Sequence, residues 1–193
     1  MKTKLLFTVM LSFSVILGSA QIINVPTDQP IIQAGINAAT TGDTVLVEEG
    51  VYYENIRFMG KAITVASHYI IDLDTTHIPS TIIDGSQSSN PDSAAVVMFL
   101  NKEDTTSILK GFTITGGTGV LSAFYNIRKG GGIYCNKAGA KITNNMIVEN
   151  HLNHDNKAGG AGIGCERDDD DRWIIIQNNT ISYNTTSTSG FSA

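Results

Sequence analysis

The sequence predicts an all-β protein built as a parallel β-helix, a solenoid whose coils stack strand upon strand. A motif recurs along the chain: residues 144–150 match residues 178–184, 34 positions later, and residues 111–117 form a looser copy 33 positions earlier. The segments between the copies are rich in Gly, Asn, Asp and Ser, which are turn-forming residues. No convincing helical period follows residue 42, whereas a sheet of alternating strands and helices would need crossover helices. A repeat made only of strands fits a solenoid, in which each coil pairs with its neighbours.

Residues 1–20 have the layout of a secretory signal peptide. Lys2 and Lys4 precede an apolar run, and Gly18, Ser19 and Ala20 supply the small residues of a cleavage site. A membrane anchor is the weaker alternative, because the run is shorter than the ~20 apolar residues that a spanning helix needs. We therefore expect cleavage after Ala20 and an exported protein, located outside the cell, on its surface or in a periplasm. No transmembrane segment is expected after removal of the signal.

The remaining chain, residues 21–193, has the length of one domain. The full chain carries a net charge of −5, and loss of the leader removes two lysines. No basic stripe is present, which argues against a nucleic-acid partner. Because the last residues, 185–193, are mostly small and polar and supply no cap, we expect the coils to be incomplete at the C-terminus, as in a fragment of a longer protein.

The domain is expected to open with an N-terminal cap over residues 26–42. Thr27 and Asp28 are candidates for the N-cap of a helix, and Pro30 suits its first turn. Gly42 is a natural stop. The helix places three apolar residues on one face: Ile32, Ile36 and Ala39.

The coils are expected over residues 43–193. Strand-like runs occupy residues 44–47, 62–66, 81–83, 95–100, 112–115, 142–148 and 173–181. Alternation within these runs and in the 132–135 segment assigns side chains to faces. Ile114, Ile133 and Ile147 are expected to point inward, and Tyr134 outward.

Two pairs of residues are expected to stack as a structural ladder between coils. Asn145 and Asn179 occupy equivalent inward corners, where stacked amides can hydrogen-bond to each other and to the bend. Cys135 and Cys165 occupy equivalent inward positions in adjacent coils. Stacked strands bring such cysteines within the Cα range of a disulfide, although parallel side chains strain the bridge. A buried pair of free thiols and a disulfide both stay open.

The run TDQPIIQAGINAATTGDTVLVEEGVYYENI resembles the opening of pectin-lyase-like β-helix proteins, in which an amphipathic helix covers the first coil. The stretches STIIDGS, LKGFTITGG, GGGIYC and KITNNMIVEN are similar to later coils of that superfamily. The resemblance covers roughly residues 25–184. It implies a right-handed parallel β-helix with an N-terminal capping helix, of the kind found in repetitive secreted or surface proteins of bacteria.

Enzymes of this superfamily act on acidic polysaccharides with clustered acids and an arginine on an exposed strand face. The outward residues that can be assigned here are mostly uncharged, and no Gly-His-Gly element is present. We therefore assign no catalytic residue and expect a non-catalytic secreted or cell-surface protein for adhesion or glycan contact. Its expected partner is an extracellular polysaccharide or a cell-surface glycan. A polysaccharide lyase or glycoside hydrolase with active-site coils outside this segment, and a structural stalk, are the alternatives.

Two segments carry metal-binding residue types. The densest run of acids suggests calcium, the one candidate cofactor, and consists of Asp168, Asp169, Asp170 and Asp171. The run lacks the spacing of a known calcium loop and Arg172 flanks it, which favours a solvated loop; in a lyase, Arg172 would be the base. His151 and His154 have a zinc-like spacing, but a polar loop does not hold both on one face as a helix does.

Overall fold

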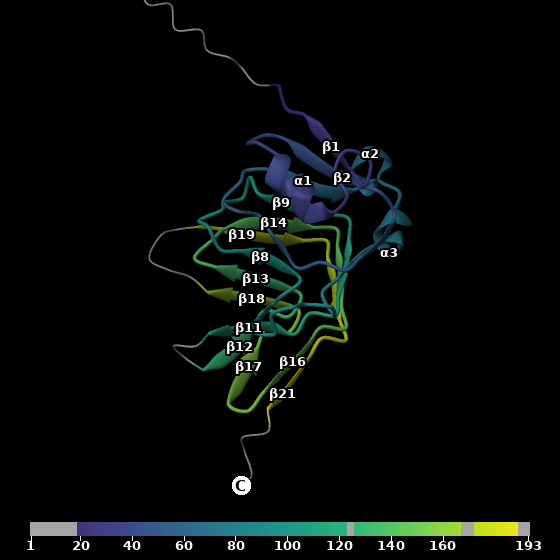
Figure 1. Ribbon diagram of the computed structural model, residues 1–193. Helices are drawn as coiled ribbons and strands as arrows, with labels where there is room; N and C mark the ends of the chain where they lie inside the picture. Colours follow the sequence, from purple (N-terminus) through teal and green to yellow (C-terminus); the bar gives the residue numbers. More distant parts are fainter. Residues whose placement is uncertain (1–18, 123–125, 167–171, 189–193) are drawn as a thin grey trace, which may run out of the picture.

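The computed structural model describes residues 19–122, 126–166 and 172–188, and within them the chain forms a parallel β-solenoid (Figure 1). Three sheets run along it, and each stacks strands from successive coils. The first sheet has the order β1 (Ile22–Val25), β2 (Thr44–Val47), β5 (Thr64–Ser67), β9 (Ile108–Lys110), β14 (Ala140–Thr143) and β19 (Ile174–Gln177). The second has the order β3 (Gly50–Tyr52), β6 (Thr81–Asp84), β10 (Thr113–Thr115), β15 (Met146–Val148) and β20 (Thr180–Ser182). The third has the order β4 (Ile56–Arg57), β8 (Val97–Phe99), β13 (Ile133–Asn136) and β18 (Ile163–Glu166). The predicted all-β class and the stacked parallel architecture are confirmed.

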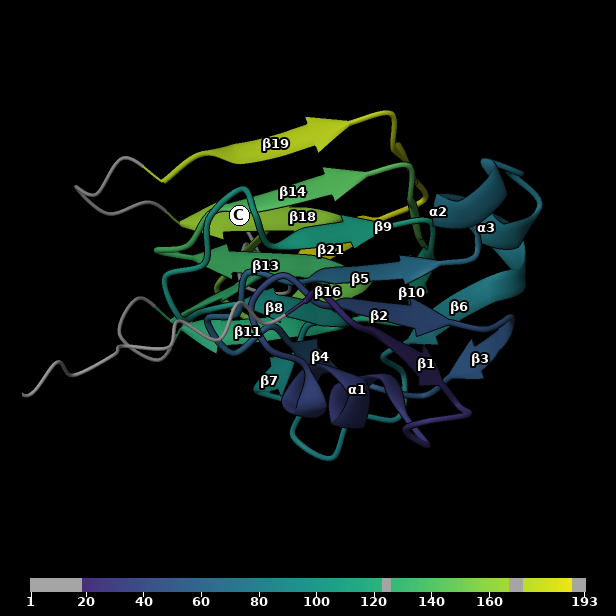
Figure 2. The ribbon, with the colours of Figure 1, turned by 90° about the horizontal axis from the view of Figure 1, so that it is seen from above.

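Aliphatic side chains form the core by stacking in register from coil to coil. In the first sheet, Val45 pairs with Val65, which pairs with Leu109, and Leu109 pairs with Ile142. All four side chains are fully buried. Figure 2 shows the strands of this sheet side by side, from β1 to β19. Burial of each such side chain contributes about 1.5–3 kcal/mol to stability. Because side chains alternate between the two faces of a strand, a slip of one residue in the pairing would turn the whole ladder outward and lose this contribution.

A residue with left-handed backbone turns the chain between the first and second sheets. In three successive coils this residue is Gly111, then Asn144, then Asn178, with φ angles of 87°, 57° and 55°. Gly and Asn adopt this conformation more readily than other residues. The corner splits the runs predicted as single strands: residues 142–148 belong to β14 and β15, and residues 173–181 to β19 and β20.

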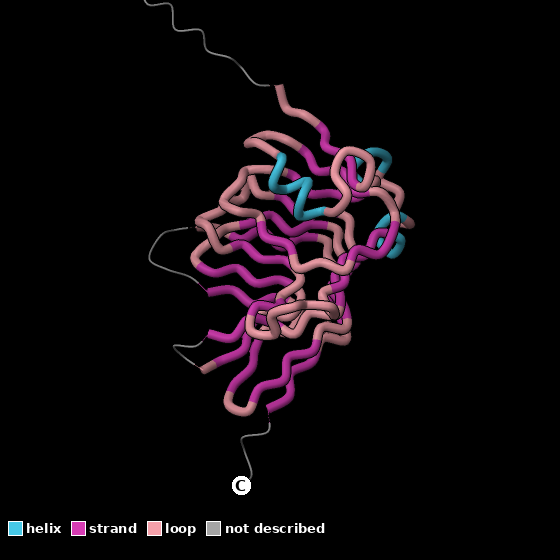
Figure 3. Tube along the Cα trace, viewed as in Figure 1, coloured by secondary structure: helices cyan, strands magenta, loops and turns pink. Residues whose placement is uncertain are grey.

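The helix α1 (Ile32–Ala38) covers the end of the solenoid at which the chain enters it (Figures 2 and 3). Its Ile32 and Ile36 are fully buried in the main core. An end without such a cover would expose core side chains, which solenoids avoid with terminal caps. The helix is shorter than the predicted segment 26–42. The strand β1 precedes it and pairs with β2, so the first sheet begins before the helix and not after it.

The predicted N-cap residues are wrong. Ile31 occupies the N-cap position and makes no side-chain hydrogen bond there. The carboxylate of Asp28 instead accepts hydrogen bonds from the backbone and side-chain N–H groups of Asn24, both at 2.8 Å. Thr27 also lies outside the cap position. The cap comes from Glu54, far along the chain, because the corner before β4 brings it to the helix end.

Two excursions depart from the coil pattern. The single-turn helices α2 (Tyr69–Asp72) and α3 (His77–Ser80) lie between β5 and β6. None of the three helices in the described ranges is long and apolar enough to cross a bilayer. A fourth sheet has the order β17 (Lys157–Gly159), β12 (Ile127–Lys129), β11 (Gly119–Ser122) and β7 (Ser93–Ala94), and β11 is antiparallel to both neighbours. Val120 of this sheet packs on a small outer cluster that contains Tyr134 and Met98. Tyr134 therefore points away from the main core, yet it is only 3% exposed.

The last described coil shows core positions without a cover. Ile176 and Ile181 continue the inward ladders above Ile142 and Ile147. They are nevertheless 44% and 48% exposed, whereas Ile142 and Ile147 are fully buried. The strand β21 (Thr185–Thr188) of this coil pairs with β16 (His151–His154) in a fifth, two-stranded sheet.

Candidate functional site

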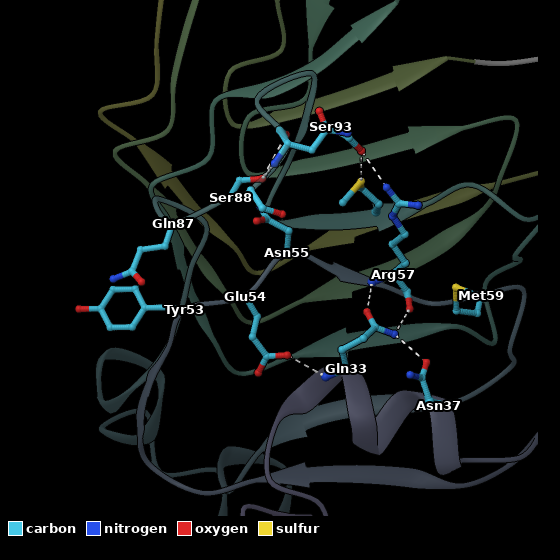
Figure 4. A pocket seen from close by; sticks show the side chains of 13 residues that line it. Gln33, Asn37, Tyr53, Glu54, Asn55, Arg57, Met59, Gln87, Ser88 and Ser93 are labelled. Carbon is cyan, nitrogen blue, oxygen red and sulfur yellow. Dashed lines mark hydrogen bonds between the residues drawn. The ribbon is translucent and has the colours of Figure 1, made fainter.

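A groove of about 530 Å³ opens beside α1, between this helix, β4 and the segment 87–93 (Figure 4). Ligand sites of proteins commonly have volumes of ~300–1,000 Å³. Side-chain amides are the commonest group among the lining residues: Gln33, Asn37, Asn55, Gln87 and Asn90. The groove is also lined by Tyr53, Glu54, Arg57, Met59, Ser88, Ser89, Ser93 and Met98. None of them was singled out from the sequence, because they come from three separate segments.

Gln33 fixes the helix side of the groove. Its Oε1 accepts a hydrogen bond from the Arg57 backbone N–H at 2.7 Å, and its Nε2 donates to the Arg57 carbonyl at 3.2 Å. The same Nε2 donates to Asn37 Oδ1 at 3.0 Å. The amide of Gln33 therefore pairs with the backbone of β4 much as a neighbouring strand would, and it holds α1 and Arg57 in a fixed relation.

Glu54 is the only carboxylate among the described residues that line the groove. Its Oε1 accepts a hydrogen bond from Ile32 N at 2.8 Å, and its Oε2 accepts one from Gln33 N at 2.9 Å. These are N–H groups of the first helical turn, which have no partner within the helix. Glu54 thus caps α1. Hydrolysis of a glycosidic bond commonly uses two carboxylates, and this groove offers one that is already engaged.

Arg57 crosses the groove toward the segment 87–93. Its Nη2 donates to Ser93 Oγ at 2.8 Å, and Ser93 Oγ lies 3.7 Å from Met98 Sδ. Among the described residues, no carboxylate forms an ion pair with Arg57. Since a guanidinium has five N–H donors, the exposed Arg57 keeps donors for a ligand.

Two exposed side chains with apolar surface stand at the edges of the groove. Tyr53 is 54% exposed and Met59 is 51% exposed. Figure 4 places Tyr53 beside Gln87 and Met59 on the other side of Arg57. The ring of Tyr53 offers a flat apolar face, and the amides offer paired donors and acceptors. This combination suits a ligand that has apolar ring faces and hydroxyl edges.

The structure brings together Asn145 and Asn179, which the sequence predicts as a ladder. Asn179 Oδ1 accepts hydrogen bonds from Asn145 N at 2.9 Å and from Asn145 Nδ2 at 3.0 Å. Asn145 Oδ1 in turn accepts one from Phe112 N, in the coil below, at 3.0 Å. Asn145 is 2% exposed, so these bonds satisfy polar groups at a buried corner.

A second ladder, Asn150 with Asn184, is absent from the sequence-based expectations. Asn184 Oδ1 accepts from Asn150 N at 3.1 Å and from Asn150 Nδ2 at 2.9 Å, and Asn150 Oδ1 accepts from Gly117 N at 2.9 Å. Both asparagines lie within the repeat that identified the first pair. The same 34-residue spacing could have revealed them.

Cys135 and Cys165 are register partners in β13 and β18, and both are free thiols. Cys135 is buried, but Cys165 is exposed. The expectation that both are buried is therefore wrong for Cys165. The reason is that β18 is the last strand of the third sheet in the described part of the chain, so no further strand covers it.

The two metal-binding candidates have different outcomes. The calcium candidates Asp168, Asp169, Asp170 and Asp171 lie outside the described residues. His151 and His154 lie in β16 and not in a loop; residues three apart in a strand point to opposite faces. Within the described ranges, no group of three or more His, Cys, Asp or Glu side chains is placed to hold a metal ion.

A second polar cluster joins α2 and α3 to the turn after β2. His77 Nδ1 lies 2.8 Å from Glu49 Oε1, and His77 Nε2 lies 3.1 Å from Asp72 Oδ2. The hydrogen bonds to Asp72 and Glu49 raise the pKa of His77 above its ordinary value. Nearby, His68 Nε2 lies 3.1 Å from Glu48 Oε1. This cluster holds the helical excursion against the solenoid.

Comparisons of the chain with protein-family models, curated proteins and solved structures find no significant match.

Proposed function

We propose that this protein is an exported, non-catalytic β-solenoid that binds a glycan in the groove beside α1. One observation carries the proposal. The groove combines the exposed ring of Tyr53, five side-chain amides and the Arg57 guanidinium, while its one carboxylate serves as a helix cap. Such a lining is equipped to bind a sugar and poorly equipped to cleave one.

Each part of the lining has a matching feature on a sugar. A pyranose ring can stack on Tyr53 through its apolar C–H face. The amides can donate to one hydroxyl and accept from the next. Arg57 can donate to hydroxyls or to the carboxylate of an acidic sugar. The partner class is therefore an extracellular polysaccharide or a cell-surface glycan.

Calorimetric titration of the purified protein with neutral and uronic-acid oligosaccharides tests the proposal. The change Tyr53→Ala is expected to weaken binding about 3- to 10-fold, the loss of one ring contact. Tyr183→Ala is the matched control, because Tyr183 is 79% exposed at the far end of the solenoid. Equal effects of the two changes would exclude the groove as the binding site. Unsaturated products that absorb in the ultraviolet would contradict a non-catalytic role.

Export is inferred from the N-terminal sequence pattern, and one contact supports the cleavage position. The backbone N–H of Gln21 donates to Asp43 Oδ1 at 2.8 Å, so the residue that cleavage after Ala20 would leave first is the first described residue bonded to the solenoid. The mass of the protein recovered after export would show Gln21 as its first residue. Retention of residues 1–20 in the exported protein would contradict this inference.

We also propose that the chain is a divergent member of the pectin-lyase-like superfamily. The support is the parallel solenoid, the helix over its first coils and the stacked asparagines at its corners. An experimental structure in which the coils wind left-handed would overturn this assignment.

A further inference from the structure

Cys135 and Cys165 stand above Phe99 in one inward stack of the third sheet, and Phe58, directly after β4, packs against Phe99. The rings of Phe58 and Phe99 lie with their centroids 4.3 Å apart, Phe99 pairs with Cys135, and Cys135 pairs with Cys165. Adjacent parallel strands are ~4.8 Å apart, within the ~4.4–6.8 Å Cα range of disulfides. The two thiols are therefore direct neighbours, one coil apart.

The two thiols differ sharply in access. Cys135 is 0% exposed, whereas Cys165 is exposed on the side where the described third sheet ends. A depression of about 230 Å³ is lined by Cys165, Arg172, Trp173 and Ile174. Of the two thiols, only Cys165 is among the described residues that line this depression, and Cys135 is buried.

The thiols also differ in their ease of ionisation. The hydrogen bond that they share, with Cys135 as donor, lowers the pKa of Cys165. The same bond, together with burial, raises the pKa of Cys135. Since the thiolate is the nucleophile of a cysteine, Cys165 is the more reactive of the two.

We propose that Cys165 is a modification site for low-molecular-weight disulfides and that Cys135 is its resolving thiol. The Cys165 thiolate attacks one sulfur of the small disulfide, forms a mixed disulfide and releases one thiolate. The Cys135 sulfur then attacks the Cys165 sulfur, and its proton goes to a released thiolate. The products are a Cys135–Cys165 disulfide and two small thiols, so the small disulfide is reduced and the protein pair oxidised. This chemistry does not depend on the glycan groove.

The test treats the reduced, desalted protein with oxidised glutathione, quenches samples with acid and measures intact masses. The wild-type protein is expected to lose two hydrogens and to keep no adduct. Cys135→Ser is expected to accumulate one glutathione adduct, on Cys165. Cys165→Ser is expected to react at least about tenfold more slowly, because its remaining thiol becomes accessible only when the structure opens locally.

Because a serine in a packed stack can disturb folding, the wild-type protein supplies a second test. Peptide mapping of early quenched samples is expected to place the transient adduct on Cys165. A first adduct on Cys135, a lasting adduct on the wild-type protein or an unchanged rate in Cys165→Ser would each overturn the proposal.

Discussion

Glu54 and Lys61 hold opposite ends of the capping helix α1, although neither belongs to it. Glu54 accepts two N–H groups of the first turn. Lys61 Nζ donates to three carbonyls at the other end, those of Ile36, Asn37 and Ala39, at 2.7, 2.8 and 2.8 Å. Each charge is opposite in sign to the partial charge of the helix dipole at its end, so both contacts are favourable. The helix is thus stabilised from the coil on which it lies.

The change Lys61→Met is expected to lower the free energy of unfolding by about 1.5–3 kcal/mol, because three carbonyls lose a charged donor. Urea denaturation followed by circular dichroism measures this. Lys137→Met is the control, since Lys137 is exposed and no described hydrogen bond or ion pair involves its side chain. The control should stay within about 0.5 kcal/mol of the wild type. Equal stability of the two variants would show that the Lys61 contacts do not support the helix.

Asn150→Ala is expected to destabilise the protein by about 1–3 kcal/mol, because it leaves buried backbone groups of two coils unsatisfied. Asn150 is fully buried, and Asn179→Ala should have an effect of the same sign. Asn153→Ala, at an exposed position of β16, is the matched control and should change the melting temperature little. An unchanged melting temperature of Asn150→Ala would refute a stabilising role for the second ladder.

Comparing Gly111→Ala with Gly42→Ala separates the cost in stability of backbone strain from the cost of crowding. Gly111 has φ 87° and Gly42 has φ 96°, but an added Cβ at Gly111 would collide with the Ser67 hydroxyl, whereas nothing lies within 4 Å at Gly42. Gly42→Ala is expected to cost about 1–2 kcal/mol, the backbone term alone. Gly111→Ala should cost about 1–3 kcal/mol more, the cost of overpacking. Equal losses in urea denaturation would mean that the corner can relax.

The cluster around His77 predicts a dependence of stability on pH. The pKa of His77 is raised in the folded state, so its protonated form stabilises the fold. This contribution is fully present below the pKa of the unfolded state, about 6.5, and is lost as the pH rises through the folded-state pKa. His77→Gln should therefore lower the melting temperature more at pH 5.5–6 than at pH 8.5, values chosen about the histidine pKa.

His151→Gln is the control for this profile, because the His151 ring contacts the Thr185 hydroxyl and not a carboxylate. A loss of stability in His77→Gln that is the same at all pH values would show that only the packing of the ring matters.

Much of the fold follows from local patterns in the sequence. The β-type run at residues 44–47 and the repeat around Asn145 and Asn179 predict strands that stack coil upon coil, and the structure has them. The sequence-based predictions are wrong where a residue's role depends on a partner that is distant in sequence. Asp28 looks like a helix cap by sequence, but Glu54 takes that role because the coil brings it there. The antiparallel strand β11 has no local signal that separates it from a parallel coil strand.

The candidate groove could not be predicted in the same way. Gln33, Arg57 and Ser93 are far apart in sequence, and their meeting depends on how α1 lies across β4. The cysteine stack, by contrast, follows from a fixed spacing. The difference in exposure between Cys135 and Cys165 could not be predicted from that spacing, because it depends on the position of β18 at the end of the described sheet.

The asparagine ladders have a consequence for how such a molecule can change in length. Each ladder amide offers its oxygen to the coil below and its own N–H groups to the oxygen of the coil above, as Asn145 does between Phe112 and Asn179. A duplicated coil that carries the same two asparagines could therefore be inserted between two existing ones and leave no amide unpaired. The hydrogen bonds at these corners therefore set no fixed number of turns, because each added turn both supplies and satisfies the same pair of amides.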